Sequence, residues 1–243
     1  MRLLDLLSLA ALVACAGGNK PGDSRSSSVA DTVAPRYATD FSLSESPLSD
    51  GGQWLNGGTD GLDWTDVSTT PHHAIGHQVG ASYTDATAIL KGDWGPNQSA
   101  TATIFTTGPI ADICVAELEM RLRSSIAPHS NRGYEVTFKV SQTDKAYLII
   151  VRWNGVLGDF TTLLEKYGAR YGVQNGDTMT ATIVGNRITA YKNGVEMGHA
   201  TDDTYTGGNP GMGFNLENSH AGCPGINDRY GFTSFRASDG IDR

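Results

Sequence analysis

The sequence predicts an antiparallel all-β fold in which two sheets pack as a β-sandwich. Residues 178–197 read as two successive hairpins: the alternating, β-branched segments 178–184 and 187–192 meet at Gly185-Asn186, and Asn193-Gly194 reverses the chain again. The 30 glycines and the turn clusters between the other alternating segments fit many short strands. Helical periodicity is weak throughout.

The two hairpins have registers that agree with each other. Two-residue turns place Ile183 opposite Ile188 and Ala181 opposite Ala190, and the Asn193-Gly194 turn then places Ala190 opposite Met197. These pairs share one apolar face, which we expect to lie against the core. The remaining strands are expected at 37–43, 73–79, 86–92, 99–107, 114–123, 133–141, 146–153, 159–164, 195–200, 211–217 and 229–237.

The N-terminal region reads as a targeting segment followed by a tether. Residues 1–15 hold a short apolar run that ends in Leu12-Val13-Ala14-Cys15, which matches the bacterial lipobox and predicts lipidation of Cys15. An ordinary secretory signal is the alternative. Residues 16–36 are a flexible Gly/Ser/Pro-rich tether, and residues 37–243 form one domain. Because Ala16 follows the cysteine, we expect a lipid-anchored protein of the outer membrane or cell surface.

Charge and cysteine content narrow the functional class. The chain has a net charge of -8, whereas nucleic-acid binders carry an excess of basic residues, so no nucleic-acid partner is expected. With Cys15 lipidated, Cys114 and Cys223 are left as a pair that would form a disulfide in an oxidising compartment, the alternative being two buried thiols.

Three consecutive segments can be registered as a meander. Alternation in 114–123 and 134–140 places Arg121 opposite Glu135, Glu119 opposite Thr137 and Glu117 opposite Lys139 on the outward face. For 147–153 the expected core set is Tyr147, Ile149, Val151 and Trp153, which would place Arg152 outward and opposite Glu135.

This charged face has two interpretations. Alternating opposite charges form a cross-strand ladder that needs no ligand. Alternatively, Arg121, Glu135 and Arg152 are contact residues of a carbohydrate groove.

Three tryptophans in Gly- and Asp-rich loops are candidate sugar platforms, because the CH face of a sugar stacks on an aromatic ring. These are Trp54, Trp64 and Trp94, and the alternative is that they cap the sandwich core.

The hairpin segment followed by the Gly207–Phe214 run GGNPGMGF resembles the ending of concanavalin A-like lectin/glucanase (LamG-like) jelly rolls of bacterial surface proteins. The resemblance implies a concanavalin A-like jelly roll and a polysaccharide partner. We therefore expect a lipoprotein that binds carbohydrate without catalysis. A structural surface protein with no small ligand is a further alternative.

An enzyme is the other reading of the same face. The Glu-x-Asp strand motif of the related glucanases is absent, and Arg121 and Arg123 follow where the acid/base would be expected. Jelly-roll polysaccharide lyases resemble one another in a different pattern of catalytic residues. In this sequence the residues that could fill that pattern are Arg121, Glu135, His129 and Arg152.

Metal binding is indicated weakly. The spacing of His72, His73 and His77 is not a strong zinc signature. The oxygen-rich turns suit Ca²⁺ better, with ligands left unassigned, and no other cofactor is expected.

Overall fold

The computed structural model describes residues 36–58, 64–77, 85–217, 223 and 226–240. The described residues all belong to one compact unit. The expected signal segment, Cys15 and the tether up to residue 35 lie outside the described residues. Within the described part, no helix is long and apolar enough to span a membrane.

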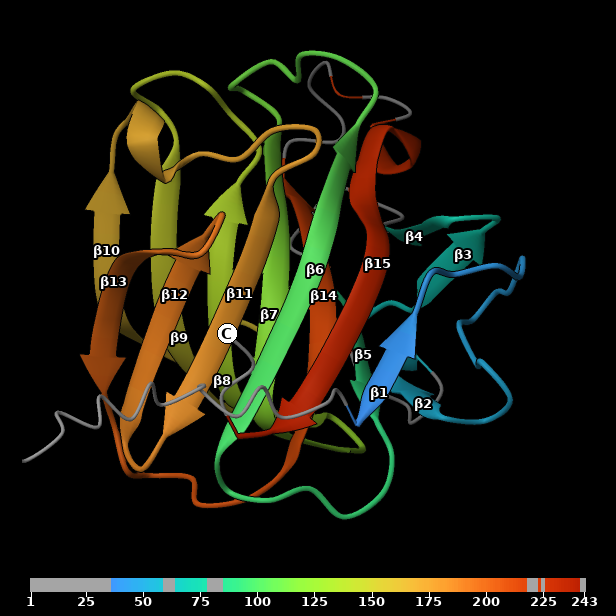
Figure 1. Ribbon diagram of the computed structural model, residues 1–243, viewed down its shortest axis with the longest axis vertical. Helices are drawn as coiled ribbons and strands as arrows, with labels where there is room; N and C mark the ends of the chain where they lie inside the picture. The colour runs from blue at the N-terminus through green and yellow to red at the C-terminus, as the bar shows by residue number, and fades with distance from the viewer. Residues whose placement is uncertain (1–35, 59–63, 78–84, 218–222, 224–225, 241–243) are drawn as a thin grey trace, which may run out of the picture. The chain divides into compact units, whose positions relative to one another are not determined.

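The described residues form two antiparallel sheets packed face to face (Figure 1). Sheet A has the strand order β13-β12-β11-β6-β15-β4-β3, and β1 pairs with β15 beside this path. Its strands are β1 (Tyr37–Thr39), β3 (Val67–Thr70), β4 (His73–Gly76), β6 (Gln98–Thr106), β11 (Thr178–Val184), β12 (Arg187–Lys192), β13 (Val195–Thr201) and β15 (Tyr230–Asp239).

Sheet B has the order β10-β9-β8-β7-β14-β5-β2. Its strands are β2 (Trp54–Asn56), β5 (Ala86–Leu90), β7 (Val115–Ala127), β8 (Ser130–Lys139), β9 (Tyr147–Gly155), β10 (Phe160–Tyr167) and β14 (Asn209–Glu217). Two short 3₁₀ turns, η2 (Ala169–Tyr171) and η3 (Asn227–Arg229), connect strands. The two-sheet all-β architecture predicted from the sequence is therefore confirmed.

The core fills the space between the two sheets. Every second residue of the long strands points into it, because side chains alternate across a β-strand. Its fully buried members include Leu118, Met120, Tyr134, Val136 and Phe138 from sheet B and Ala181, Ile183, Ile188, Phe232 and Phe235 from sheet A.

The hairpin prediction is confirmed except at its last pair. β11 and β12 have the predicted bounds, and Ile183 pairs with Ile188 and Ala181 with Ala190. Ala190, however, lies opposite Gly198 and not Met197, because a bulge between Ala190 and Tyr191 shifts the register. β2 and β3 were not predicted, since strands of three and four residues beside turns carry little alternation.

The meander prediction is right for β7 and β8 and wrong for β9. Arg121 pairs with Glu135, Glu119 with Thr137 and Glu117 with Lys139, as predicted. Arg152 lies opposite Tyr134, whereas Val151 lies opposite Glu135. A shift by one residue moves a whole strand to its other face. Leu148 and Ile150 therefore join the main core, while Val151 and Trp153 pack outside it with Trp64.

The predicted disulfide is confirmed. Cys114 and Cys223 are bonded, with their Cα atoms 5.7 Å apart. The bridge closes a loop with a sequence separation of 109 residues and ties the entry of β7 to the segment that precedes β15.

Candidate functional site

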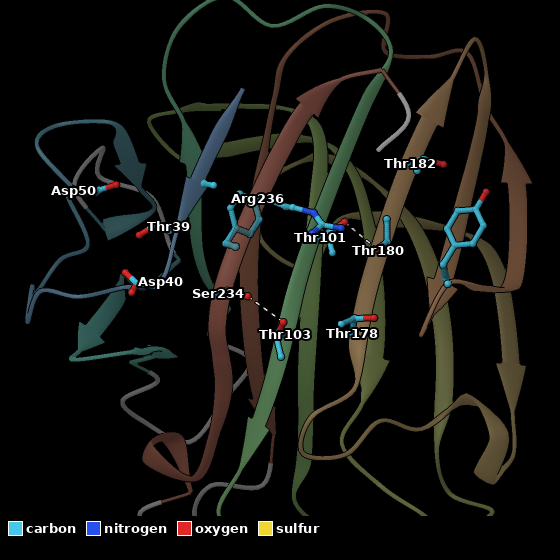
Figure 2. Close-up of a pocket in the computed structure, with 14 residues that line it drawn as sticks. Thr39, Asp40, Asp50, Thr101, Thr103, Thr178, Thr180, Thr182, Ser234 and Arg236 are labelled. Atoms are coloured by element: carbon cyan, nitrogen blue, oxygen red, sulfur yellow. Dashed lines mark hydrogen bonds between the residues drawn. The ribbon is translucent and has the colours of Figure 1, made fainter. Parts of the chain in front are cut away.

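A groove of about 920 Å³ lies on the outer face of sheet A. Its floor comes from β15, β6 and β11, and β1 lies along one side (Figure 2). Its lining is dominated by hydroxyls and backbone: Ala38, Thr39, Asp40, Asp50, Thr101, Thr103, Thr178, Thr180, Thr182, Tyr191, Gly194, Ser234, Phe235 and Arg236.

The strand registers arrange these side chains in rows that cross the strands. One row runs through Arg236 on β15, Thr101 on β6, Thr180 on β11 and Tyr191 on β12. Three strand spacings of about 4.8 Å give this row a length of about 14 Å. The arrangement follows from the Thr-x-Thr spacing in two neighbouring strands, which places every threonine of each strand on the same face.

A second row lies beside the first and joins Ser234, Thr103 and Thr178. Hydrogen bonds hold both rows in place: the Thr101 and Thr180 Oγ1 atoms are 2.9 Å apart, and Ser234 Oγ donates to Thr103 Oγ1 at 3.0 Å (Figure 2). A hydroxyl has one donor and two acceptor positions, so each of these side chains retains capacity for a ligand.

The β1 side of the groove is acidic. Asp40 and Asp50 line it, and the Tyr37 hydroxyl donates to Asp50 Oδ2. Burial, followed by the hydrogen bond to Asp50, raises the pKa of Tyr37 above its usual range, so the phenol stays a donor. Arg236 is the cationic side chain of the lining, and its side chain extends toward Thr101 in Figure 2. The lining therefore has no excess of positive charge.

The outer face of sheet B carries a different kind of site, a buried charge cluster. The Arg121 side chain is fully buried and donates to Glu135 Oε2 from Nη1 and to Glu119 Oε2 from Nη2, the latter at 2.5 Å. Trp153 Nε1 donates to Glu135 at 2.6 Å and Thr137 Oγ1 donates to it at 2.5 Å. Three side-chain donors thus converge on the Glu135 carboxyl group.

Glu119 has a different environment. Burial, reinforced by the charges of Glu135 and Asp85 and opposed by Arg121, raises the pKa of Glu119 well above its usual range. A small cavity of about 50 Å³ lies beside these groups and is lined by Asp85, Glu117, Glu119, Glu135, Thr137, Ile149, Val151, Trp153, Phe160 and Asn215. This volume accommodates an ion or a few water molecules, not a sugar ring.

The structure separates the residues that the sequence grouped as one charged face. Arg121 and Glu135 are together, as predicted, but both are buried. Arg152 is not part of this cluster: its Nη1 donates to Asp202 at 2.6 Å and to Thr204 at 2.8 Å. His129 lies at the exposed turn between β7 and β8, outside the linings of the groove and the small cavity.

The three loop tryptophans occupy three environments, none of them an open platform. Trp54 is in the core against Tyr37 and Phe235 and is 3% exposed. Trp64 packs edge-on against Trp153 with ring centroids 5.4 Å apart. Trp94 is covered by the Arg36 guanidinium, 4.5 Å from its ring.

The histidines also have separate environments. His72 lies 3.6 Å from Asp40, and the His73 ring packs against Phe105. Among the described residues, the group with metal-ligating geometry is Asp85, Glu119 and Glu135, which contains no histidine.

The groove was not predicted from the sequence. Its available signal was the Thr-x-Thr spacing at 101–103 and 178–182, within segments that were expected to be strands. This signal is not specific, because threonine is common in strands that bind nothing.

Comparisons with known proteins identify the fold through structure. No family model matches the chain, and no curated protein matches it. Several solved structures do. The inactivated mutant of beta-agarase B in complex with agaro-octaose aligns with a TM-score of 0.53 at 9% identity, covering 85% of this chain and 92% of that one.

Two carbohydrate-recognition structures align as well. The potassium-bound Emp46p carbohydrate recognition domain has a TM-score of 0.52 at 11% identity and covers 84% of this chain and 96% of that one. The Ca²⁺/Man3GlcNAc-bound VIP36 exoplasmic/lumenal domain has a TM-score of 0.51 at 10% identity, covering 78% and 84%. At these identities the likeness concerns the fold, and it shows that this chain has the concanavalin A-like jelly-roll fold.

Proposed function

We propose that this domain binds carbohydrate, and that the ligand lies in the groove on the outer face of sheet A. The observation that carries the proposal is the cross-strand row of Thr101, Thr180 and Tyr191 in a groove of about 920 Å³. A polysaccharide offers alternating hydroxyls and CH faces. Threonine hydroxyls match the former and the Tyr191 ring matches the latter.

The charge of the lining favours a neutral or weakly charged glycan. The lining contains one cationic side chain, Arg236, and two carboxylates, Asp40 and Asp50, so a strongly anionic chain gains little from the groove as a whole. The groove also has sufficient volume for several sugar units, since ligand sites for small molecules usually occupy about 300–1,000 Å³.

The solved structures with this fold support the ligand class. Two of them are named for carbohydrate recognition or for a bound glycan, and a third is an agarase with agaro-octaose. These names describe those proteins. For this chain the likeness concerns the fold, and the proposal of binding rests on the residues that line the groove.

We infer a binding role and not a catalytic one. The residues proposed from the sequence for a lyase, Arg121, Glu135, His129 and Arg152, do not meet around one open space. Arg121 is bonded to Glu135, which borders a cavity of about 50 Å³, whereas Arg152 pairs with Asp202. Polysaccharide lyase or glycosidase activity remains the alternative outcome of the binding test.

We further propose that the domain is held at the cell surface by lipid on Cys15 and stands clear of the membrane on the 16–36 tether. The support is the lipobox and the tether composition. Detergent phase partition of the full chain and of Cys15→Ala tests this: the unchanged chain should enter the detergent phase and the variant should remain in the aqueous phase. Equal partition of both chains contradicts the anchor.

The binding proposal is tested by a glycan array and by retardation in polysaccharide gels, with product analysis for reducing and unsaturated ends. We expect retardation without products, and loss of retardation in Tyr191→Ala. Tyr167→Ala is the matched control, because Tyr167 is 61% exposed on β10 of the other sheet. No retardation by any glycan, or equal loss in both variants, would overturn the proposal, and product formation would replace it with an enzyme.

A further inference from the structure

We propose that sheet B holds a calcium ion beside its buried charge cluster, bound by carboxylate oxygens of Asp85, Glu119 and Glu135 and by the amide oxygen of Asn215. This site lies on the opposite sheet from the proposed glycan groove and is independent of it.

The first argument is distance. One carboxylate oxygen from each of Asp85, Glu119 and Glu135 lies within 4.8 Å of the others. Calcium–oxygen distances of about 2.3–2.6 Å place oxygens on opposite sides of the ion about 4.6–5.2 Å apart. A single Ca²⁺ therefore reaches all three, with little movement.

The second argument is an unpartnered acceptor. Asn215 is 2% exposed and lines the small cavity together with the three acids. Its Nδ2 donates to Glu117 Oε2 at 2.5 Å, whereas its Oδ1 has no hydrogen-bond partner. A buried carbonyl oxygen without a donor costs free energy, and a cation in the cavity removes that cost.

The third argument is charge. Four carboxylates, Asp85, Glu117, Glu119 and Glu135, line the cavity. Arg121 is the cation bound directly to two of them, and Lys139 nearby is bound to Asp112. Buried carboxylates are stable when they are paired or coordinate a metal. A divalent cation would balance the excess, and hard oxygen ligands select Ca²⁺ over softer metals.

The backbone leaves room for this arrangement. Gly213 on β14 lies between Glu119 on β7 and Thr87 on β5. A Cβ atom at Gly213 would lie 2.2 Å from Glu119 Oε2, so the carboxylate lies across the space that a side chain would fill. Because Gly213 has no side chain, Glu119 can extend toward β5. Asp85 comes directly before the first residue of β5.

The test starts with the full chain after treatment with EDTA. Calorimetric titration with Ca²⁺ should show one bound ion, and the thermal midpoint should rise with Ca²⁺ concentration, since a ligand that binds the folded state stabilises it. Tb³⁺ serves as a luminescent probe for the same site. Excitation of Trp153, which donates to Glu135, should sensitise it, and Ca²⁺ should displace it.

Variants locate the ion. Asp85→Asn should weaken Ca²⁺ binding by about tenfold or more, and Asn215→Asp should strengthen it, because ligand charge tunes calcium affinity. Glu196→Gln, on exposed β13, is the control and should bind like the unchanged chain. Trp153→Phe should lower the sensitised Tb³⁺ signal without abolishing Ca²⁺ binding, and Trp64, whose ring lies against Trp153, accounts for the signal that is left.

Asn215→Asp keeps the test decisive if Asp85→Asn does not fold. The proposal is overturned if Ca²⁺ produces neither heat nor a shift in the thermal midpoint. It is also overturned if Asn215→Asp leaves the Ca²⁺ affinity unchanged, since the ion would then lie elsewhere on the molecule.

Discussion

The side chains of Thr101 on β6 and Thr180 on β11 share a hydrogen bond across the floor of the groove, with their Oγ1 atoms 2.9 Å apart. They lie in one cross-strand row with Arg236 and Tyr191. Their mutual bond fixes the rotamers of both side chains, so the remaining hydroxyl positions face the groove in a defined direction. Such a pre-ordered row loses little side-chain entropy when a glycan binds.

Thr180→Val should weaken glycan binding severalfold. Valine has nearly the same shape but no hydroxyl, and a single neutral hydrogen bond contributes about 0.5–1.5 kcal/mol. Calorimetric titration with the glycan found on the array measures the change. Thr87→Val is the control, because Thr87 lies on β5 of sheet B. An unchanged affinity in Thr180→Val would show that the hydroxyl row does not contact the ligand.

Arg121→Met should lower the free energy of unfolding by about 3–5 kcal/mol, because it leaves buried carboxylates without their cation. Arg121 is fully buried and joined to Glu119 and Glu135. Arg187→Met removes the exposed pair with Glu196 and should cost less than about 1 kcal/mol. Urea unfolding of both variants measures the difference. Equal losses of unfolding free energy would contradict the expectation that the buried ion pairs of Arg121 contribute more than the exposed pair of Arg187.

Gly213→Ala should destabilise the fold by about 1–3 kcal/mol through overpacking. The new methyl group would meet Glu119 Oε2 at 2.2 Å and Arg121 Nη2 at 2.9 Å. Gly207→Ala is the matched control, because no atom lies within 4 Å of its Cβ position. If both variants melt at the same temperature, Glu119 does not lie over Gly213 in solution.

Asp112→Asn should remove part of the loss of stability in acid. Hydrogen bonds from Ser141 and Thr143 lower the pKa of Asp112 from its ordinary value of 3.8. A carboxyl with a lower pKa in the folded chain stabilises the fold above the unfolded value, and this contribution disappears as the pH falls through the folded value. Unfolding should therefore be less pH-dependent below about pH 4 in the variant. A profile identical to that of the unchanged chain would contradict the assignment.

The sequence predicts faces well where a strand is apolar on one side. β7 and β8 alternate cleanly, so the Arg121–Glu135 pair and its neighbours were correct. β9 is apolar on both sides, because Leu148 and Ile150 lie in the core while Ile149, Val151 and Trp153 face the outer cluster. Alternation then cannot choose the face, and the pairing of Arg152 was wrong by one residue.

The candidate site was harder to predict than the fold. The groove depends on β15 pairing with β6, two strands separated by more than a hundred residues in the chain. Arg236 and Tyr191 meet the threonines only through that order of strands. The prediction of Trp54 as a sugar platform depended on a similar long-range contact. Trp54 belongs to the core because β2 pairs with β5, and no local sequence pattern predicts that pairing.

The location of the glycan is tested most directly by methyl NMR of threonine-labelled protein during titration with the glycan selected on the array. We predict that the methyl signals of Thr101, Thr103, Thr178, Thr180 and Thr182 shift, because these residues line the groove. The methyl signals of Thr87 and Thr137 on sheet B should remain in place. Shifts at Thr87 and Thr137 with none in the groove would contradict the account and move the binding site to the other sheet.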